Sequence, residues 1–401
     1  MSKKITPVLL GADLNCYSMA RAFHEAYGVR SHAFGKQALG ESAHSKIIKF
    51  TAVPGLGRQE TLLRTLLAFA SDHADEELYL VPCTDEYALA VIENQKILGK
   101  HYFCPCPEKE LAKKLASKEE FCNMCKTHGL PHPKTEFFRK ESAFSRLASL
   151  PFPYPIIIKP ASSVEYWRAP FEGMKKVYTA QNAEEAEKII SAIYSAGYKN
   201  TVILQELVHG AEDDMYVLTT YSDKNAKVRA ACMGRVLLGE HTPKGLGNHV
   251  AILTEYHNEI AEKLITFLER TGYRGFANFD IIFDRSCGGF RVLELNPRQG
   301  RSNYYVTASG MNIAELLVCD GRGEPSQGKK LCRESFFWHT VPKKIIYRYI
   351  TEKNLENEVR ALAEQGKSAS SLFYGKDLWL NPLRAAYVFI HNMIYFGKYN
   401  I

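Results

Sequence analysis

The stretch from residue 272 to residue 302, GYRGFANFDIIFDRSCGGFRVLELNPRQGRS, constrains the fold more than any other part of the chain. Two segments with strand character, 276–284 and 290–296, flank a turn rich in glycine and serine. Side chains on a strand alternate between its two faces, so the apolar residues of each segment share one face and the polar residues share the other. The stretch therefore predicts a β-hairpin with one core face and one polar face.

The polar face of this hairpin gathers carboxylates and carboxamides. With the turn centred near residue 287, Asp280 lies opposite Glu294, and Asn278 lies opposite Asn296. Two opposed carboxylates repel each other unless one is protonated or a cation lies between them. Oxygen ligands of this kind suit Mg²⁺, which also binds phosphate oxygens, and the guanidinium of Arg298 would follow just beyond. From the pattern alone, a solvated hairpin face is the competing interpretation.

The order of residues on the hairpin, Asp280 and then Glu294-x-Asn296-Pro297-Arg298, resembles the metal-binding strands of the ATP-grasp ligases. These enzymes cleave ATP to join a carboxylate to an amine through an acyl phosphate. The longer run LELNPRQGRSNYYVTASG and the opening LLGADLNCYSMARAFHEAYG are similar to the D-aspartate ligase branch. That branch adds D-aspartate to the lysine side chain of a peptidoglycan precursor. The resemblance covers nearly the whole chain and implies ATP and Mg²⁺ as cofactors.

Length, charge and hydropathy exclude several classes of protein. The chain has 401 residues, enough for two or three packed lobes, and its net charge of +7 suits anionic small-molecule substrates. We expect no nucleic-acid partner, because no block of lysine and arginine is dense enough. No apolar run is long enough to cross a bilayer, and residues 5–10 are too few for a secretory signal, so we expect a cytoplasmic protein. The sequence leaves the oligomeric state open.

The cysteines allow two interpretations. Ten are present, and Cys104-x-Cys106 and Cys122-x-x-Cys125 have a spacing compatible with a four-thiolate zinc site. The second pair falls inside a predicted helix, and the resemblance does not call for zinc. Reduced structural thiols are the preferred interpretation.

The order of elements predicts a fold of mixed α/β and α+β class. In residues 1–107, predicted strands alternate with predicted helices, which is typical of a mostly parallel sheet. The strands are expected at 5–10, 47–50 and 78–82, and the helices at 16–27, 58–70 and 85–97. No G-x-G-x-x-G motif accompanies the first helix, so we do not expect a dinucleotide. The helix start at 11–15 is either scaffold or a holder for a substrate carboxylate.

The resemblance implies three segments. Residues 1–107 would form an N-terminal, Rossmann-like pre-ATP-grasp domain, residues 108–330 the ATP-grasp domain with its two lobes, and residues 331–401 a C-terminal segment on its core. In the last segment the sequence favours strands at 336–339 and 344–349. It favours an amphipathic helix at 383–399, either docked on the core or free for a membrane surface or partner.

By resemblance, two lysines would contact the nucleotide phosphates. Lys118 lies within a helix expected at 108–128, and Lys159 ends an apolar strand expected at 156–158. The loop 161–176 would be the flap over the phosphates. It is aromatic where many relatives are rich in glycine, so its closure stays open.

The remaining site residues also follow from the resemblance. At the hinge, Glu206 and the backbone of Val208 would read adenine. One of Asp213 and Asp214, with Asp214 preferred, would meet the ribose, and Arg235 would contact phosphate. A solvated loop is the competing interpretation for Asp214. The polar loop 239–249 is either part of the acceptor site or a flexible connector.

An acyl phosphate must be shielded from water, and the attacking amine passes through a tetrahedral oxyanion. Arg298 is the predicted stabiliser of that charge, with Arg301 near the reacting carboxylate.

Three hypotheses about function remain. The first is a ligase joining the β-carboxyl of D-aspartate to the lysine amine of a UDP-linked muramyl pentapeptide. The second is an ATP-grasp ligase for another amino acid or a dipeptide. The third is a nucleotide-binding regulatory module without turnover, which the presence of both carboxylates and the arginine on the hairpin argues against.

Overall fold

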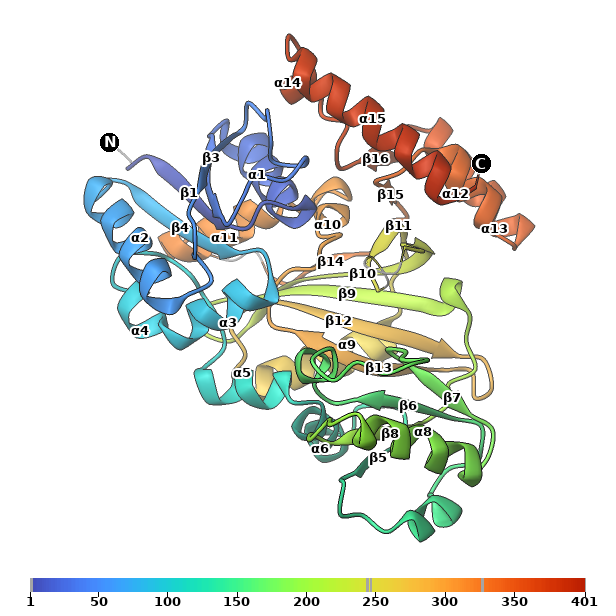
Figure 1. Ribbon diagram of the computed structural model, residues 1–401. Coiled ribbons are helices and arrows are strands. Elements are labelled where there is room, and N and C mark those ends of the chain that lie inside the picture. The colour runs from blue at the N-terminus through green and yellow to red at the C-terminus, as the bar shows by residue number, and fades with distance from the viewer. Residues whose placement is uncertain (1–2, 243–244, 246, 326–327, 401) are drawn as a thin grey trace. The chain divides into compact units, whose positions relative to one another are not determined.

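A computed structural model describes residues 3–242, 245, 247–325 and 328–400 (Figure 1). The chain forms two compact units. Unit 1 comprises Met1–Lys113, Ala211–Asp280 and Leu295–Ile401, and unit 2 comprises Lys114–Gly210 and Ile281–Glu294. Each unit is built from several separate stretches of the chain, whereas the sequence predicted three consecutive domains. The boundaries of those three domains stay a prediction.

The first sheet of unit 1 is parallel, as the alternation of strands and helices predicted. Its strands run in the order β3-β2-β1-β4, with β1 Ile5–Leu10, β2 Ser31–Gly35, β3 Ile48–Ala52 and β4 Glu77–Pro82. The helices between them are α1 Leu14–Tyr27, α2 Gln59–Asp72, α3 Asp85–Glu93 and α4 Gln95–Leu98. Every residue of β1 is buried, which explains its unbroken apolar run.

Helix α1 begins and ends with the expected signals. The carboxylate of Asp13 accepts a hydrogen bond from the Cys16 amide at 3.3 Å, and Gly28 ends the helix in the left-handed region at φ 65°. Asp13 therefore caps this helix, and the Cys16 amide at the helix start already faces a carboxylate of the protein itself.

The larger sheet has the order β13-β12-β9-β10-β11-β15-β16, with β14 paired to β10 (Figure 1). Its strands are β9 Met215–Ser222, β10 Val228–Gly239, β11 His249–Thr254, β12 Gly275–Asp284, β13 Gly289–Asn296, β14 Lys330–Cys332, β15 Phe337–His339 and β16 Ser368–Ser370. Strands β12 and β13 confirm the predicted hairpin segments to within a residue. Helix α9, Asn258–Arg270, packs on β9 and β10, and α10 Tyr304–Ala308 and α11 Ile313–Arg322 follow the hairpin.

One C-terminal prediction is wrong. The segment expected as a strand at 344–349 is helix α12, Lys343–Tyr349. Its isoleucine and tyrosine content favours a strand locally, but Ile345 and Ile346 are fully buried in a cluster with Val359 of helix α13, Lys353–Glu364. Tertiary burial outweighs the local β preference here. The strand expected at 336–339 is confirmed as β15.

The C-terminal helix α15, Pro382–Lys398, docks on unit 1, as the simpler of its two interpretations predicted. A fully buried ion pair, Arg384 Nε to Asp377 Oδ2 at 3.2 Å, ties it to helix α14, Gly375–Leu378. The outer face of α15 remains apolar, with Phe389 and Ile390 66% and 54% exposed. Among the residues that the structure describes, no helix has the length and apolar character needed to cross a bilayer.

Unit 2 is built on an antiparallel sheet of order β5-β8-β6-β7. Its strands are β5 Thr135–Phe138, β6 Ile156–Pro160, β7 Tyr178–Ala180 and β8 Val202–Glu206. Its helices are α6 Lys118–His128, α7 Ser163–Tyr166, α8 Ala183–Ser195 and the 3₁₀ turn Phe144–Ser149. Helix α8 packs on β7 and closes a core with buried side chains from β6 and β8.

The single helix expected at 108–128 is two helices, α5 Lys109–Ala116 and α6, so this prediction is wrong at its centre. Ser117 has extended backbone, with φ −82° and ψ 116°, and its hydroxyl accepts from the Glu120 amide at 3.4 Å. A serine in this position caps a new helix and interrupts the old one. Lys118 is consequently the first residue of α6.

Candidate active site

The polar face of the hairpin gathers around Asp280 in unit 1. Asn296 Nδ2 lies 3.4 Å from Asp280 Oδ2, and Asn278 Nδ2 lies 3.5 Å from Asp280 Oδ1. His249 Nε2, from the start of β11, is 4.0 Å from the same carboxylate. The predicted grouping of Asp280 with Asn296 is thus confirmed. A carboxylate with two neighbouring carboxamides, whose Nδ2 atoms face it in this structure, supplies the kind of side chain that Mg²⁺ uses, since the ion takes one or two protein carboxylates and completes its shell with water and phosphate.

Glu294, the second carboxylate predicted for the metal, is an exposed residue of β13 and falls in unit 2. It acts electrostatically on the two lysines predicted for the phosphates. Its role as a metal ligand stays a prediction.

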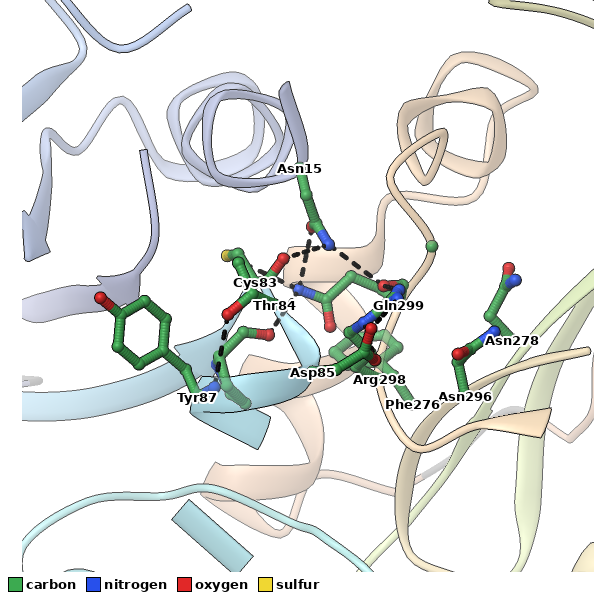
Figure 2. A network of polar contacts seen from close by, with 12 residues as sticks. Asn15, Cys83, Thr84, Asp85, Tyr87, Phe276, Asn278, Asn296, Arg298 and Gln299 are labelled. Atoms are coloured by element: carbon green, nitrogen blue, oxygen red, sulfur yellow. Dashed lines mark hydrogen bonds and ion pairs between the residues drawn. The ribbon is translucent and has the colours of Figure 1, made fainter. Parts of the chain in front are cut away.

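Arg298 is held by an aspartate that sequence reasoning assigned no such role. Its Nε and Nη2 donate to the two carboxylate oxygens of Asp85 at 2.7 and 2.9 Å, and its Nη1 donates to the Gln299 carbonyl at 3.0 Å (Figure 2). Burial alone would lower the pKa of Arg298, but the pairing with Asp85 raises it above its ordinary value. The guanidinium is therefore permanently charged and fixed in orientation.

The helix cap explains why Asp85 is available for this pairing. Thr84, not Asp85, caps α3, because its hydroxyl accepts from the Tyr87 amide at 3.3 Å (Figure 2). The position of Asp85 in the sequence could have indicated this role. Asp85 lies just beyond the carboxyl end of β4, and ligand-binding residues of parallel sheets collect at this end of the strands.

A buried amide network anchors the loop that carries both predicted catalytic arginines. Asn15 Nδ2 donates to the carbonyls of Cys83 at 2.9 Å and Gln299 at 3.1 Å, and Gln299 Nε2 donates back to Asn15 Oδ1 at 3.2 Å (Figure 2). The side chain of Asn303 also reaches Asn15 Oδ1, at 2.8 Å. These bonds join α1 and the end of β4 to the loop 297–303, which follows β13. The backbone that carries Arg298 and Arg301 is therefore held rigidly.

Arg301 lies in a different electrostatic setting from Arg298. Its Nη2 is 3.7 Å from Glu41 Oε1, which is too long for a hydrogen bond. Its charge also acts on Asp13, whose pKa is raised by burial and only partly lowered by Arg301 and Arg298. The helix start at Asp13 is thus occupied by a buried acid, which favours the scaffold interpretation of the segment 11–15.

Two residues predicted for the nucleotide have structural partners in unit 1. Arg235 donates through Nε to the Asp213 carbonyl at 2.7 Å, and its Nη2 lies 3.2 Å from Glu352 Oε1. Asp214 is 5% exposed and accepts from the Ala211 amide at 2.7 Å, closing a 3₁₀ turn. Their roles toward phosphate and ribose stay predictions.

The two predicted phosphate lysines share one electrostatic environment in unit 2. Lys159 donates to Gln205 Oε1 at 2.9 Å, and Lys118 lies 3.5 Å from the Pro160 carbonyl. Burial, followed by the charge of Lys118, lowers the pKa of Lys159 to about 8, and burial also lowers the pKa of Lys118. Two partly buried cations, of which Lys118 lowers the pKa of Lys159, favour a polyanionic ligand, so this cluster fits the phosphates of a nucleotide.

The predicted hinge and flap have well-defined local contacts. Glu206 Oε1 accepts from the Lys134 amide at 2.8 Å, and the Val208 carbonyl accepts from the Gly210 amide at 3.1 Å. In the flap, Tyr166 is 1% exposed and its hydroxyl lies 2.6 Å from that of Tyr178. Adenine reading and flap closure stay predictions.

The cysteines carry no disulfide, and all ten are free. Within the described ranges, no group of three or more histidine, cysteine, aspartate or glutamate side chains is arranged to hold a metal ion. The zinc interpretation therefore gains no support from this structure.

The fold is that of the ATP-grasp enzymes. The biotin carboxylase domain of Hydrogenobacter thermophilus 2-oxoglutarate carboxylase, in complex with MgADP, ADP and bicarbonate, superposes with a TM-score of 0.62 and 13% identity over 82% of this chain and 72% of that one. An L-amino acid ligase from Bacillus licheniformis superposes with a TM-score of 0.55 and 13% identity over 80% and 75%. At this identity the likeness establishes the fold, as predicted from the hairpin motif.

The sequence comparison narrows the class to a family. The chain is 35% identical to the D-aspartate ligase of Enterococcus faecium (strain Aus0004) over 413 aligned positions, which cover 99% of this chain and 97% of the relative. No protein-family model matches. The chain belongs to the D-aspartate ligase family and is an ATP-dependent carboxylate–amine ligase. ATP and Mg²⁺, the cofactors predicted from the sequence, are those of this class.

Proposed function

We propose that this enzyme activates the β-carboxyl of D-aspartate as an acyl phosphate and joins it to the lysine amine of a UDP-linked muramyl pentapeptide. The observation that carries the proposal is the end-to-end similarity to a D-aspartate ligase, with Asp280, Glu294, Asn296 and Arg298 in the order that the motif requires. A carboxylate is a poor electrophile, and MgATP, when bound, supplies the phosphoryl group that turns it into a better one.

Different residues of the chain would bind the metal ion, the phosphates and the nucleoside. Asp280, Asn296 and Glu294 would hold Mg²⁺ through oxygen atoms, and Lys118 and Lys159 would neutralise the phosphates. Lys159 suits this role because an anionic ligand restores the proton that burial disfavours. Glu206 and Val208 would contact adenine, Asp214 ribose, and Arg235 phosphate.

Arg298 would stabilise the oxyanion that forms when the amine attacks. The pairing with Asp85 keeps the Arg298 guanidinium charged and fixed in orientation. The side chain therefore needs little reorientation when negative charge develops on the substrate. Arg301, on the same rigid loop, would lie near the reacting carboxylate and contact the carboxylate of the amino acid that does not react.

The experiment that tests this function is ADP release by the purified protein with MgATP, D-aspartate and UDP-muramyl pentapeptide. We expect release that needs both D-aspartate and the pentapeptide, with L-aspartate as the inactive control, and a product heavier by one aspartyl residue. Release with another amino acid in place of D-aspartate would refute the substrate and keep the ligase. ATP binding without ADP formation from any amino acid would favour a regulatory role.

The metal assignment has its own test. Asp280→Asn and Glu294→Gln keep the size of each side chain and remove one negative charge, so both should abolish turnover while the far-UV circular dichroism stays unchanged. The exposed Glu184, which pairs only with Lys188 on α8, offers the control Glu184→Gln, with wild-type turnover expected. Wild-type rates in either site variant would refute a metal role for that residue.

A further inference from the structure

A pocket of about 470 Å³ lies within unit 1, bounded by helix α15, the end of β10 and the loop after β13. This volume is typical of small-molecule sites, which run from about 300 to 1,000 Å³. Among the described residues, its charged lining consists of Glu41, Glu240, Arg301 and Lys398. The pocket thus presents two carboxylates and two cations, and a ligand carrying both signs of charge matches it.

Glu240 is the buried carboxylate of this pocket, with 5% of its surface exposed. Its Oε2 accepts from the Tyr395 hydroxyl at 2.5 Å and lies 3.8 Å from Lys398 Nζ. Its Oε1 is buried and has no hydrogen-bond partner among the residues that the structure describes. A buried carboxylate oxygen without a donor is costly, so a ligand that brings an N–H group stabilises this arrangement.

The rest of the lining defines the other end of such a ligand. Arg301 has no hydrogen-bonding distance to Glu41, so its planar fork can bind a carboxylate with two parallel hydrogen bonds. His391 Nδ1 is buried without a partner in the same described set, and burial lowers the pKa of His391 to about 4. The imidazole is therefore neutral at pH 7 and leaves the charge balance of the pocket unchanged.

The strand pair β10 and β11 connects the pocket wall to the carboxylate assigned to the metal. Gly239, next to Glu240, pairs with His249 across β10 and β11, and His249 Nε2 is 4.0 Å from Asp280.

We propose that this pocket binds the amino-acid substrate as a zwitterion, with Glu240 accepting from its ammonium and Arg301 binding its α-carboxylate. The side-chain carboxyl is then the group left to be activated, which explains why the β-carboxyl, not the α-carboxyl, would react. This assignment rests on the proposed function, in that a free amino acid is the carboxylate donor.

The test compares three ligands that differ by one charged group each. Succinate is aspartate without the ammonium, and β-alanine is aspartate without the α-carboxylate. Binding is measured by calorimetry in the presence of Mg²⁺ and a non-hydrolysable ATP analogue, with the wild type, Glu240→Gln and Arg301→Gln. Because only binding is measured, the result does not depend on the acceptor or on turnover.

We expect the wild type to prefer D-aspartate over each analogue by about 10- to 100-fold, the effect of one charge-assisted hydrogen-bonded contact. Glu240→Gln should lose the preference over succinate and keep the preference over β-alanine. Arg301→Gln should do the reverse. Retention of the succinate preference in Glu240→Gln would overturn the assignment of Glu240.

A matched control is Asp320→Asn. Asp320 is also a partly buried carboxylate that accepts from a tyrosine, Tyr221 at 2.8 Å, but it lies outside this pocket. It should keep both ligand preferences, which separates loss of a specific contact from general destabilisation. Unchanged affinity for the ATP analogue establishes that each variant is folded.

A second variant covers the case in which Glu240→Gln does not fold. Ile394 lines the pocket from α15 and is 52% exposed, so Ile394→Trp narrows the pocket without a change in the core. It should weaken D-aspartate binding at least tenfold and leave binding of the ATP analogue unchanged, and unchanged D-aspartate affinity would overturn the pocket.

If the wild type binds another amino acid instead of D-aspartate, the proposed substrate fails, and the same comparison is made with that amino acid and its analogues lacking the amine or the α-carboxylate. If the wild type binds no amino acid, the pocket assignment itself is overturned.

Discussion

The partly buried amine of Lys159 makes nucleotide binding a proton-linked event. Its pKa is lowered from 10.5 to about 8, first by burial and then by the charge of Lys118. Bound phosphates would return the pKa toward its ordinary value, since an opposite charge favours the protonated amine. At about 1.4 kcal/mol per pKa unit, the full return corresponds to coupling on the order of 3 kcal/mol.

The expected signal follows directly from this value. At pH 8 about half of the Lys159 amines in the free protein lack a proton, so ATP binding should take up about half a proton, and at pH 6 almost none. Calorimetric titrations at pH 8 in two buffers of different ionisation enthalpy measure this number, because ATP itself is fully ionised at that pH. Lys159→Met should abolish the uptake.

The control is Lys188→Met, which removes an exposed lysine of the same unit that forms an ion pair with Glu184 on α8. This variant should still take up about half a proton when ATP binds at pH 8. Equal proton uptake in wild type and Lys159→Met would refute the assignment of Lys159 to the phosphates.

The same shift has a consequence for stability, with the sign fixed by linkage. Below pH 8 the native state must keep a buried charge that the unfolded chain solvates freely. Between pH 8 and 10.5 the unfolded state binds more protons at this site than the native state, so the contribution of Lys159 to stability rises with pH. The nucleotide-free Lys159→Met variant should therefore be more stable than the wild type at pH 7.

Three further predictions concern single contacts. Arg384→Met removes the cation beside the fully buried Asp377, which still accepts hydrogen bonds from Tyr17, Ser45 and the Lys46 amide, and should cost about 3 kcal/mol in urea unfolding. A loss below about 1 kcal/mol would contradict a structural role for this pair. Asp85→Asn releases the guanidinium of Arg298 and should lower kcat by about 10²-fold with ATP affinity unchanged, as steady-state kinetics would measure, whereas a wild-type kcat would show that Arg298 needs no support. Ser117→Ala removes the cap of α6 and should cost about 1 kcal/mol in thermal or urea unfolding, with no effect if the hydroxyl bond is absent in solution.

The sequence predicted those parts of the site whose residues lie close together in the chain at a regular strand spacing. The grouping of Asp280 with Asn296 followed from strand alternation, and both lie on the hairpin at the predicted positions. The errors have local causes as well. At 344–349 the β-branched and aromatic residues favoured a strand, and at Ser117 one capping hydroxyl divided an otherwise continuous helical pattern.

The sequence by itself determined the ATP-grasp class through its motif order, and the parallel opening sheet and the polar hairpin through its strand and helix periods, because these are local properties of the chain. The metal role of the hairpin and the phosphate roles of the two lysines stay predictions. Only the tertiary structure decided which groups support them. Asp85 reaches Arg298 across 213 residues, and Tyr395 reaches Glu240 across 155. Such pairs arise when folding closes long loops around a shared core, and no spacing along the chain encodes which distant side chains then meet.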